Sequence, residues 1–414
     1  MIPEGTGEVL FLAHRIPFPP DRGDKIRSHH VLRHIAARVP VHVATFADDP
    51  FDMAEEPALS QIAASHCLVH RAKPLPLAGV EALLSRQPVS LAAFRSHAIA
   101  RYVANVLAKR PIRAIYVFSG QMGQYVPKEW RGRLVTDFVD VDSAKFEAYA
   151  QEGSGPRAWI DGREGRTLAA EEARLAGRSD VSLLVSEAEA ALFRSRLPAG
   201  IRADVRAIGN GIDCAFFDRA TVVPAPEMVA AGGPRIVFTG QMDYAPNIAA
   251  AKRAIGAILP RVRAVLPEAT AHIVGRNPPE TLTALHGLEG AHVWGRVPDI
   301  RPWLAAADVA MIPLAIARGI QNKVLEAMAM ERPVVCTSGA ATGIAAVPGR
   351  DLLVADDDAA LAEAVIRLWQ DRAAARATGE AARRFVMAEA DWDARLADLP
   401  DLLGLTSDTA RDAA

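Results

Sequence analysis

Short β-branched or aliphatic runs alternate with helical patterns along this chain, which is typical of βαβ units that build a parallel sheet covered on both faces. The first series of predicted strands lies before residue 190: EVLFLA, VHVATF, IRAIYVF, RLVTDFV and VSLLV. The second series begins at Arg235 and comprises RIVFTG, TAHIVG, AHVWG, DVAMIP, RPVVCT and DLLVAD. The pattern predicts an α/β protein with two doubly wound, Rossmann-like parallel sheets.

The chain length also favours two domains, because 414 residues exceed the size of one ordinary hydrophobic core. The Gly- and Pro-rich stretch IGNGIDCAFFDRATVVPAPEMVAAGGP separates the two series of strands and has the character of a linker. We predict an N-terminal domain over residues 1–215 and a C-terminal domain over residues 216–385. Residues 386–414 are expected to form a helix that packs back toward the N-terminal domain, followed by a frayed tail.

Charge and composition exclude several classes of protein. The formal net charge of -2 argues against a nucleic-acid partner, which normally requires a basic excess. Cys67, Cys214 and Cys336 have no metal-ligand spacing and indicate a reducing compartment. The amino terminus lacks the basic start and long apolar run of a secretory signal, and the most apolar stretch, residues 304–317, is too short to span a membrane. We therefore expect a cytoplasmic protein.

Open parallel sheets bind ligands outside the carboxyl ends of their strands, so a cleft between two facing sheets is the expected active site. The segment PLAIARGIQNKVLEAMAMERPVV, which follows a predicted strand, contains such a candidate. Asn322 is a good helix N-cap, and backbone N–H groups near Ile320 to Lys323 could hold a phosphate at the helix N-terminus. Glu326, one turn later, could accept hydrogen bonds from two ribose hydroxyls. An ordinary amphipathic helix with solvated charges fits the same residues.

The wider context resembles a known family. LEAMAMERPVV is similar to a motif of the family-4-like glycosyltransferases of the GT-B fold, in which two Rossmann-like domains face each other across a cleft. Further blocks resemble the PEP-CTERM-associated sugar transferases of exopolysaccharide systems: GDKIRSHHVLRHIA, DFVDVDSAKF, VSEAEA, NGID, FTGQMDYAPN, VPDIRPWLAAADVAMIPL and RGIQNKVLEAMAM.

The resemblance implies a hexosyltransferase-type enzyme. Such an enzyme moves a sugar from a nucleotide-diphosphate sugar to a glycan or lipid-linked acceptor in exopolysaccharide or cell-surface polysaccharide synthesis. The resemblance also implies retention at the anomeric carbon, with the departing diphosphate taking the acceptor proton. A GT-B nucleotide-sugar epimerase and a non-catalytic assembly partner that binds sugar nucleotides are the alternatives.

Donor-site roles follow from the same resemblance. Glu326 corresponds to the family's ribose-binding glutamate, and residues from Gly319 through Ile320 and Asn322 to Lys323 correspond to the diphosphate loop. Arg318 replaces a glutamate that lies near the donor sugar in the wider family, so that contact cannot be carried over. An arginine there could meet the diphosphate, an acidic sugar or solvent.

Other donor-side residues lie directly after predicted strands. Gly240 allows a close backbone approach, but Gln241 replaces the basic residue often found there. Arg276, beside Gly275, is the best replacement cation for the diphosphate. Asn247 is interpreted as the N-cap of the following helix.

Two expectations complete the donor half. Val297 lies where the family's backbone commonly contacts the nucleobase, and Asp299 is interpreted as a helix cap. No Asp-x-Asp metal pattern is evident in this half, so we predict a metal-independent reaction without a cofactor, the nucleotide sugar being a substrate.

The loop after the first strand is crowded with charge. By resemblance, Arg22, Gly23, Asp24 and Lys25 form an acceptor and phosphate loop, with Asp24 as the predicted N-cap and Gly23 allowing a tight chain entry. Together with Arg15 and Arg27, the basic residues could instead form a solvated face or a patch that contacts the anionic inner membrane.

Two residues are candidates for catalysis on the N-terminal side. His14 follows the first strand, although a structural, hydrogen-bonded histidine fits equally well. Asp142 follows DFVDVD, where Asp140 and Asp142 point to one side of an extended segment and suit sugar recognition or general-base help. A helix cap is the alternative for Asp142.

Overall fold

The computed structural model describes residues 7–20, 22–315 and 320–405. The chain divides into two compact units. The N-terminal unit comprises Met1–Asn210 with Arg395–Ala414, and the C-terminal unit comprises Gly211–Ala394. The division falls between residues 210 and 211, slightly before the predicted boundary between residues 215 and 216. Residue 386, where the predicted C-terminal segment begins, lies inside a helix of the C-terminal unit. The predicted frayed tail falls mostly outside the described residues.

The N-terminal unit contains a parallel sheet with the strand order β3-β2-β1-β4-β5-β6-β7. The strands are β1 (Glu8–Ala13), β2 (Val41–Ala47), β3 (Ser65–His70), β4 (Ile112–Phe118), β5 (Arg133–Val139), β6 (Val181–Leu184) and β7 (Val205–Ala207). Every residue of β1 and β2 is buried, as expected for strands covered on both faces. The strands predicted in this half are confirmed, whereas β3 and β7 were not predicted.

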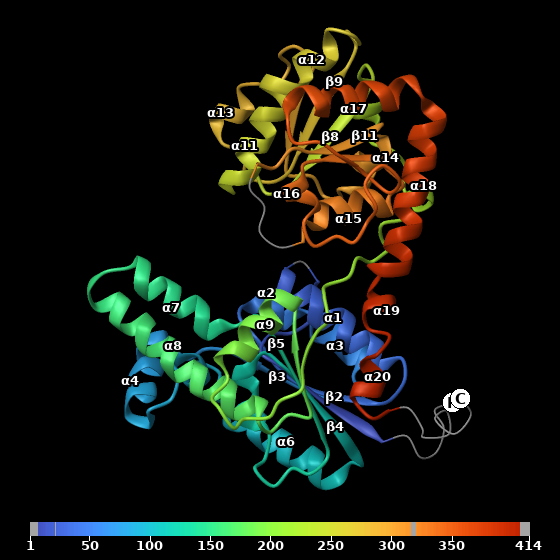
Figure 1. The fold of residues 1–414 in the computed structure, drawn as a ribbon. Helices are drawn as coiled ribbons and strands as arrows, with labels where there is room; N and C mark the ends of the chain where they lie inside the picture. The colour runs from blue at the N-terminus through green and yellow to red at the C-terminus, as the bar shows by residue number, and fades with distance from the viewer. Residues whose placement is uncertain (1–6, 21, 316–319, 406–414) are drawn as a thin grey trace. The chain divides into compact units, whose positions relative to one another are not determined.

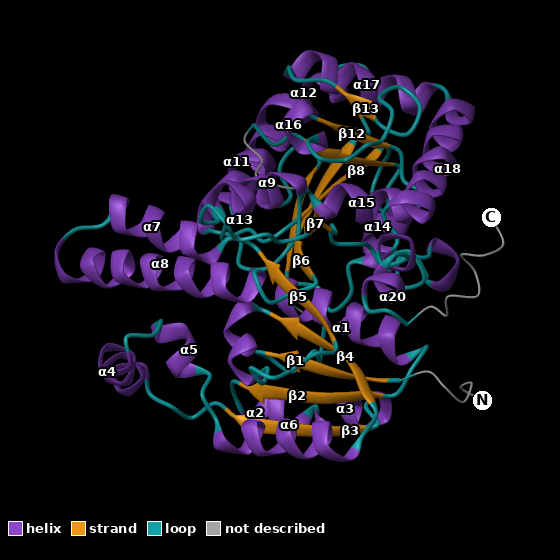
Figure 2. Ribbon diagram, turned by 60° about the horizontal axis from the view of Figure 1, so that its bottom comes forward, coloured by secondary structure: helices purple, strands orange, loops and turns teal. Residues whose placement is uncertain are grey.

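Helices cover both faces of this sheet (Figure 1). They are α1 (Gly23–Ala36), α2 (Pro50–Ala54), α3 (Glu56–Ile62), α4 (Leu75–Ser85), α5 (Val89–Ala93), α6 (His97–Lys109), η1 (Gly120–Tyr125), α7 (Asp142–Glu152), α8 (Gly155–Ala176), α9 (Glu187–Arg196) and α20 (Leu399–Leu402). In Figures 1 and 2, α7 and α8 form a long pair that extends away from the sheet, with α4 beside α8. The Nε of Arg133 donates to the carbonyl of Leu402 (2.7 Å), which ties the last described helix to this unit.

The C-terminal unit contains a second parallel sheet with the order β10-β9-β8-β11-β12-β13. The strands are β8 (Arg235–Thr239), β9 (Thr270–Val274), β10 (Ala291–Gly295), β11 (Val309–Ile312), β12 (Val334–Cys336) and β13 (Leu353–Val354). All of them lie within predicted strands, so the prediction for this sheet is confirmed. The two sheets of parallel strands with helices on both faces establish the α/β class.

The helices of this unit complete its core. They are η2 (Arg219–Thr221), α10 (Pro226–Val229), α11 (Ala245–Arg253), the π-helical turn η3 (Ala254–Ile258), α12 (Leu259–Arg263), α13 (Glu280–Thr283), α14 (Arg301–Ala306), α15 (Asn322–Ala329), α16 (Ser338–Ala341), α17 (Asp358–Gln370), α18 (Arg372–Glu389) and α19 (Trp392–Arg395). Leu361, Val365 and Leu368 of α17 recur at helical spacing and are buried. No helix among the described residues is both long enough and apolar enough to cross a bilayer.

The chain enters and leaves the C-terminal unit at adjacent points. Ile212 pairs with Asp391 in a parallel β-bridge. The N–H of Ile212 donates to the carbonyl of Ala390 (2.7 Å), and the N–H of Trp392 donates to the carbonyl of Ile212 (3.2 Å).

Each sheet has one point at which its strand order reverses direction. In the N-terminal sheet this point lies between β1 and β4, and in the C-terminal sheet it lies between β8 and β11. Crevices at such points are where open α/β sheets bind ligands. The residues that follow β1, β4, β8 and β11 are therefore candidates for ligand binding.

Candidate functional site

We call the point at which the strand order of a sheet reverses its switch point. At the switch point of the C-terminal sheet, two glycines follow the strand ends. Gly240 follows β8, and Gly275 follows β9. A Cβ at position 275 would lie 1.6 Å from the carbonyl oxygen of Gly240, so only glycine fits there. The backbone beside β8 is therefore fixed by a close main-chain contact, as the sequence predicted for strand-end glycines.

A buried amide connects this backbone to the helix after β11. The Nζ of Lys323 donates to Oδ1 of Asn247 (2.6 Å), and Nδ2 of Asn247 donates to the carbonyl of Gln241 (2.9 Å). The prediction that Asn247 is an N-cap is wrong, because α11 begins at Ala245 and Asn247 lies inside the helix. Its side chain instead orients Lys323 beside Gly240.

Burial controls the electrostatics of this site. It lowers the pKa of Lys323 to about 8, although the nearby Glu326 carboxylate opposes this shift. It raises the pKa of Glu326 to about 7, against the opposing effect of Lys323. Both side chains thus titrate near neutral pH, and a ligand that supplies negative charge to Lys323 and hydroxyl donors to Glu326 would favour their charged forms.

The N-terminus of α15 has no side-chain cap in the described part of the chain. The prediction of Asn322 as N-cap is wrong: Gln321 occupies the cap position, and Asn322 is the exposed first residue of the helix. Ile320 packs against the core of the unit. Arg318 and Gly319 lie outside the described residues. Among the described residues, no side chain caps the backbone N–H groups in the first turn of α15.

The remaining donor-side candidates have simpler surroundings. Arg276 is exposed, and its carbonyl accepts from the N–H of Met242 (2.8 Å). Val297 is partly buried against the core. Asp299 accepts from the N–H of Arg301 (2.9 Å). Its interpretation as a helix cap is wrong, because Ile300 holds the N-cap position of α14 and no side chain caps that helix in the described part of the chain.

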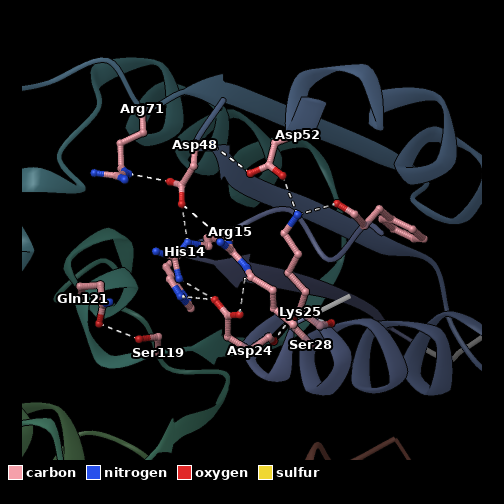
Figure 3. Close-up of polar contacts among 12 residues, drawn as sticks. His14, Arg15, Asp24, Lys25, Ser28, Asp48, Asp52, Arg71, Ser119 and Gln121 are labelled. Atoms are coloured by element: carbon pink, nitrogen blue, oxygen red, sulfur yellow. Dashed lines mark hydrogen bonds and ion pairs between the residues drawn. The ribbon is translucent and has the colours of Figure 1, made fainter. Parts of the chain in front are cut away.

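His14 lies at the N-terminal switch point, directly after β1 (Figure 3). Its ring stacks on Phe118 and meets the edge of Phe94, both with centroids at 5.8 Å. Nε2 lies 3.5 Å from Oδ2 of Asp24, whereas Nδ1 is buried without a hydrogen-bond partner among the described residues. An acid that orients a histidine in this way is the arrangement of a general base.

Asp24 belongs to a charged network (Figure 3). Nη1 of Arg15 donates to Asp24 (2.6 Å), and Nε of Arg15 donates to Asp48 (2.5 Å), which also accepts from Nε of Arg71 (2.8 Å). Burial alone would raise the pKa of Asp24, but hydrogen bonds from His14 and Arg15 outweigh it and hold this pKa far below its usual value. Asp24 is therefore ionised at neutral pH.

Two expectations for the loop before α1 are wrong. Asp24 is not the N-cap, a position held by Arg22, because its carboxylate is committed to His14 and Arg15. Gly23 is the first residue of α1 with open space around it, so no tight approach requires glycine there. Arg22 is half-exposed and reaches Asp24 at 3.7 Å.

Two of the basic residues considered for a membrane patch are buried. Lys25 is buried, and its Nζ donates to Oδ1 of Asp52 (2.5 Å) and the carbonyl of Phe18 (3.1 Å). Arg27 is buried with its Nε on Oδ2 of Asp137 (2.8 Å). These cations neutralise internal carboxylates and cannot reach a lipid surface.

The acidic cluster after β5 is divided between two environments. Asp137 is fully buried, whereas Asp140 and Asp142 both contact Nζ of Lys145, at 2.8 and 3.3 Å. Asp142 is the first residue of α7 rather than its cap, and it lines a small pocket with Asp140, Glu171 and Glu172. No hydrogen bond or ion pair joins Asp142 to His14 in the described part of the chain.

Three residues of this site were not predicted from the sequence: Asp48, Asp52 and Arg71. Asp48 and Asp52 follow β2 in the run ADDPFD, and the rule that functional groups follow strands could have identified them. Arg71 follows β3, which was itself missed. Within the described residues, no group of three or more His, Cys, Asp or Glu side chains is arranged to hold a metal ion.

These features define an α/β protein of two Rossmann-like domains with a polar site at the switch point of each sheet. Residues 233–371, which lie within the C-terminal unit, match the family described as glycosyl transferases group 1. No curated protein matches the sequence of this chain.

Solved structures resemble the chain over nearly its full length. HepE from Anabaena, in complex with UDP, is 16% identical with a TM-score of 0.62, and the match covers 96% of this chain and 100% of that one. Sucrose-phosphate synthase from Thermosynechococcus elongatus is 19% identical, with a TM-score of 0.59 over 96% and 98% of the two chains. WaaG, a glycosyltransferase of lipopolysaccharide biosynthesis, is 18% identical, with a TM-score of 0.56 over 96% and 100%. The fold is accordingly the GT-B fold.

Proposed function

We propose that this protein is a cytoplasmic glycosyltransferase. It transfers a hexose from a nucleotide-diphosphate sugar to a glycan or lipid-linked acceptor in exopolysaccharide or other cell-surface polysaccharide synthesis. The observation that carries this proposal is the group formed by Gly240, Asn247, Lys323 and Glu326 at the C-terminal switch point, inside the segment that matches group 1 glycosyltransferases.

The donor chemistry follows from these residues. Lys323 and the uncapped first turn of α15 offer positive charge and N–H donors to a diphosphate, and Arg276 adds an exposed cation. Glu326 accepts hydrogen bonds from ribose hydroxyls. HepE has been solved with UDP and with UDP-glucose, which makes UDP-glucose the first donor to test.

Transfer with retention needs no protein nucleophile in this proposal. The donor diphosphate accepts the proton of the acceptor hydroxyl as it leaves, and Lys323 with the α15 N-terminus stabilises the developing charge. His14, oriented by Asp24, and Asp142 beside Asp140 are the candidates for positioning the acceptor or assisting its deprotonation. No metal ion or cofactor takes part.

Mass spectrometry of products tests the proposal directly. The full chain is incubated with a panel of UDP- and GDP-sugars and extracted lipid-linked acceptors, with and without EDTA. The expected result is sugar transfer to an acceptor that EDTA leaves unchanged. Conversion of the sugar nucleotide without an acceptor would identify an epimerase, and calorimetric donor binding without turnover would identify a binding partner.

A further inference from the structure

Helix α4 has its small residues inside and its large apolar residues outside. Ala78 and Ala82, one turn apart, are buried. The outward residues are between 52% and 83% exposed: Leu75, Leu77, Val80, Leu83 and Leu84. A surface helix normally shows the opposite arrangement, with a polar outer face. The outward face of α4 is therefore suited to an apolar environment rather than to water.

The helix is held firmly in this orientation. Nη2 of Arg163 in α8 donates to the carbonyls of Ala82 (2.9 Å) and Gln87 (3.2 Å). The Glu164 carboxylate accepts from the N–H groups of Val89 and Ser90, at 2.7 and 2.9 Å. Hydrogen bonds from α8 thus hold α4 with Ala78 and Ala82 inward and its large apolar residues outward.

Helix α8 extends the apolar surface. Trp159 and Ile160 precede Arg163 by one helical turn and lie on the same side of α8 as Arg163, which contacts α4. They are 59% and 49% exposed. Tryptophan is enriched where a protein meets the headgroup region of a bilayer. We define the α4 surface as these residues: Leu77, Val80, Leu83, Leu84, Trp159 and Ile160.

Cations border the α4 surface. Lys73 and Arg95 share one acid, Glu81 of α4. Arg86, directly after α4, and Arg157, at the start of α8, are exposed and have no ion-pair partner in the described part of the chain. Two copies of this surface would bring like charges together, whereas an anionic lipid surface complements them.

We propose that the α4 surface inserts into the headgroup region of a bilayer that contains anionic phospholipid. This inference deepens the proposed function and rests on its membrane-associated acceptor, because a protein docked in this way would meet lipid-linked acceptors. It replaces the buried Lys25 and Arg27 as the site of membrane contact.

Vesicle co-sedimentation of the full chain tests this inference. We expect binding to vesicles of phosphatidylglycerol with phosphatidylcholine, weaker binding to phosphatidylcholine alone, and at least about a tenfold loss of binding for Leu77→Glu with Leu84→Glu. The matched control is Val265→Glu with Leu288→Glu, which changes two exposed apolar residues of the C-terminal unit and should bind as the native protein does. Arg86→Glu with Arg157→Glu should lower binding to the anionic vesicles only.

Further outcomes separate lipid from other occupants. Unchanged vesicle binding by Leu77→Glu with Leu84→Glu, the leucine variant, would overturn the proposal. A native dimer in analytical ultracentrifugation that does not bind vesicles, and that the leucine variant dissociates, would also overturn it. A vesicle-induced blue shift of fluorescence that disappears in Trp159→Phe supports it. Calorimetric donor binding by the leucine variant should equal that of the native protein, so failure of the membrane site and failure of the donor site are distinguishable.

Discussion

The ammonium of Lys323 lies 2.6 Å from the amide oxygen of Asn247, and the amide nitrogen of the same asparagine holds the carbonyl of Gln241. One buried side chain thus joins the strand end at β8 to the first turn of α15. In the proposed donor site, this connection fixes where the cation meets a diphosphate.

Asn247→Ala should destabilise the protein by about 1–3 kcal/mol, because it removes the hydrogen bonds that the buried Asn247 side chain makes with the half-buried Lys323 ammonium and the Gln241 carbonyl. The matched control is Asn322→Ala, which removes an exposed asparagine that caps nothing and should stay within about 0.5 kcal/mol. Urea unfolding measures both. Equal losses would show that the Asn247 contacts do not contribute to stability.

Glu326→Ala should weaken donor binding by about 1.5–3 kcal/mol, the worth of hydrogen bonds to a charged group. The fold should remain intact, because the carboxylate makes no hydrogen bond to other described residues. Isothermal titration calorimetry with the sugar nucleotide accepted in the donor panel measures the effect, and circular dichroism checks the fold. Unchanged affinity would remove Glu326 from the donor site.

Donor affinity should be highest between about pH 7 and pH 8. The pKa of Glu326 is raised to about 7, so affinity falls below that pH as the carboxylate gains a proton and stops accepting two hydroxyls. The pKa of Lys323 is lowered to about 8, so affinity falls above that pH as the ammonium loses its charge. Calorimetry from below pH 7 to above pH 8 should show donor affinity falling at both ends of the range. Glu326→Gln should abolish the fall at acidic pH. A flat profile for the native protein would contradict the assignment.

Gly275→Ala should destabilise the C-terminal unit severely or prevent its folding, since the added Cβ would lie 1.6 Å from the carbonyl of Gly240. Gly256→Ala is the control: it lies in the π-helical turn η3 with nothing near its Cβ position, and it should be neutral or stabilising by up to about 1 kcal/mol. Thermal unfolding compares the two. A Gly275→Ala protein as stable as the control would show that the strand ends separate freely.

Lys25→Met should destabilise the protein by about 3–5 kcal/mol, because the buried Asp52 carboxylate loses its counter-charge. Adding Asp52→Leu removes the uncompensated charge and should restore most of that loss. Chemical denaturation of the single and double variants provides the measurement. A small loss in the single variant would indicate that Lys25 is solvated rather than buried.

The strands of the C-terminal sheet could be predicted because each is a compact aliphatic run bounded by helix or turn residues. β3 was missed because SHCLVH carries polar residues and lies at the sheet edge, where it is only half-buried. β7 has three residues, too few for a periodic signal. Local pattern therefore identifies central strands better than edge strands.

The positions of the candidate site residues could be predicted from the sequence, but the partners of their side chains could not. Strand-end glycines and the N-terminus of α15 follow from local sequence, and so does the location of His14 after β1. Lys25 and Lys323, by contrast, find their partners 27 and 76 residues away in the sequence, and no local signal announces such contacts. This is why Asn247 and Asp24 were taken for helix caps when their side chains serve distant cations.

The pairing of Ile212 with Asp391 makes residues 211–394 a self-contained module inserted into the rest of the chain. Its two ends emerge side by side, so it can be excised or exchanged by joining the chain at two neighbouring points. A chimera that takes the corresponding module from another protein of this fold would need only these two joins. If the proposed donor site is correct, the donor preference of the chimera follows the exchanged module.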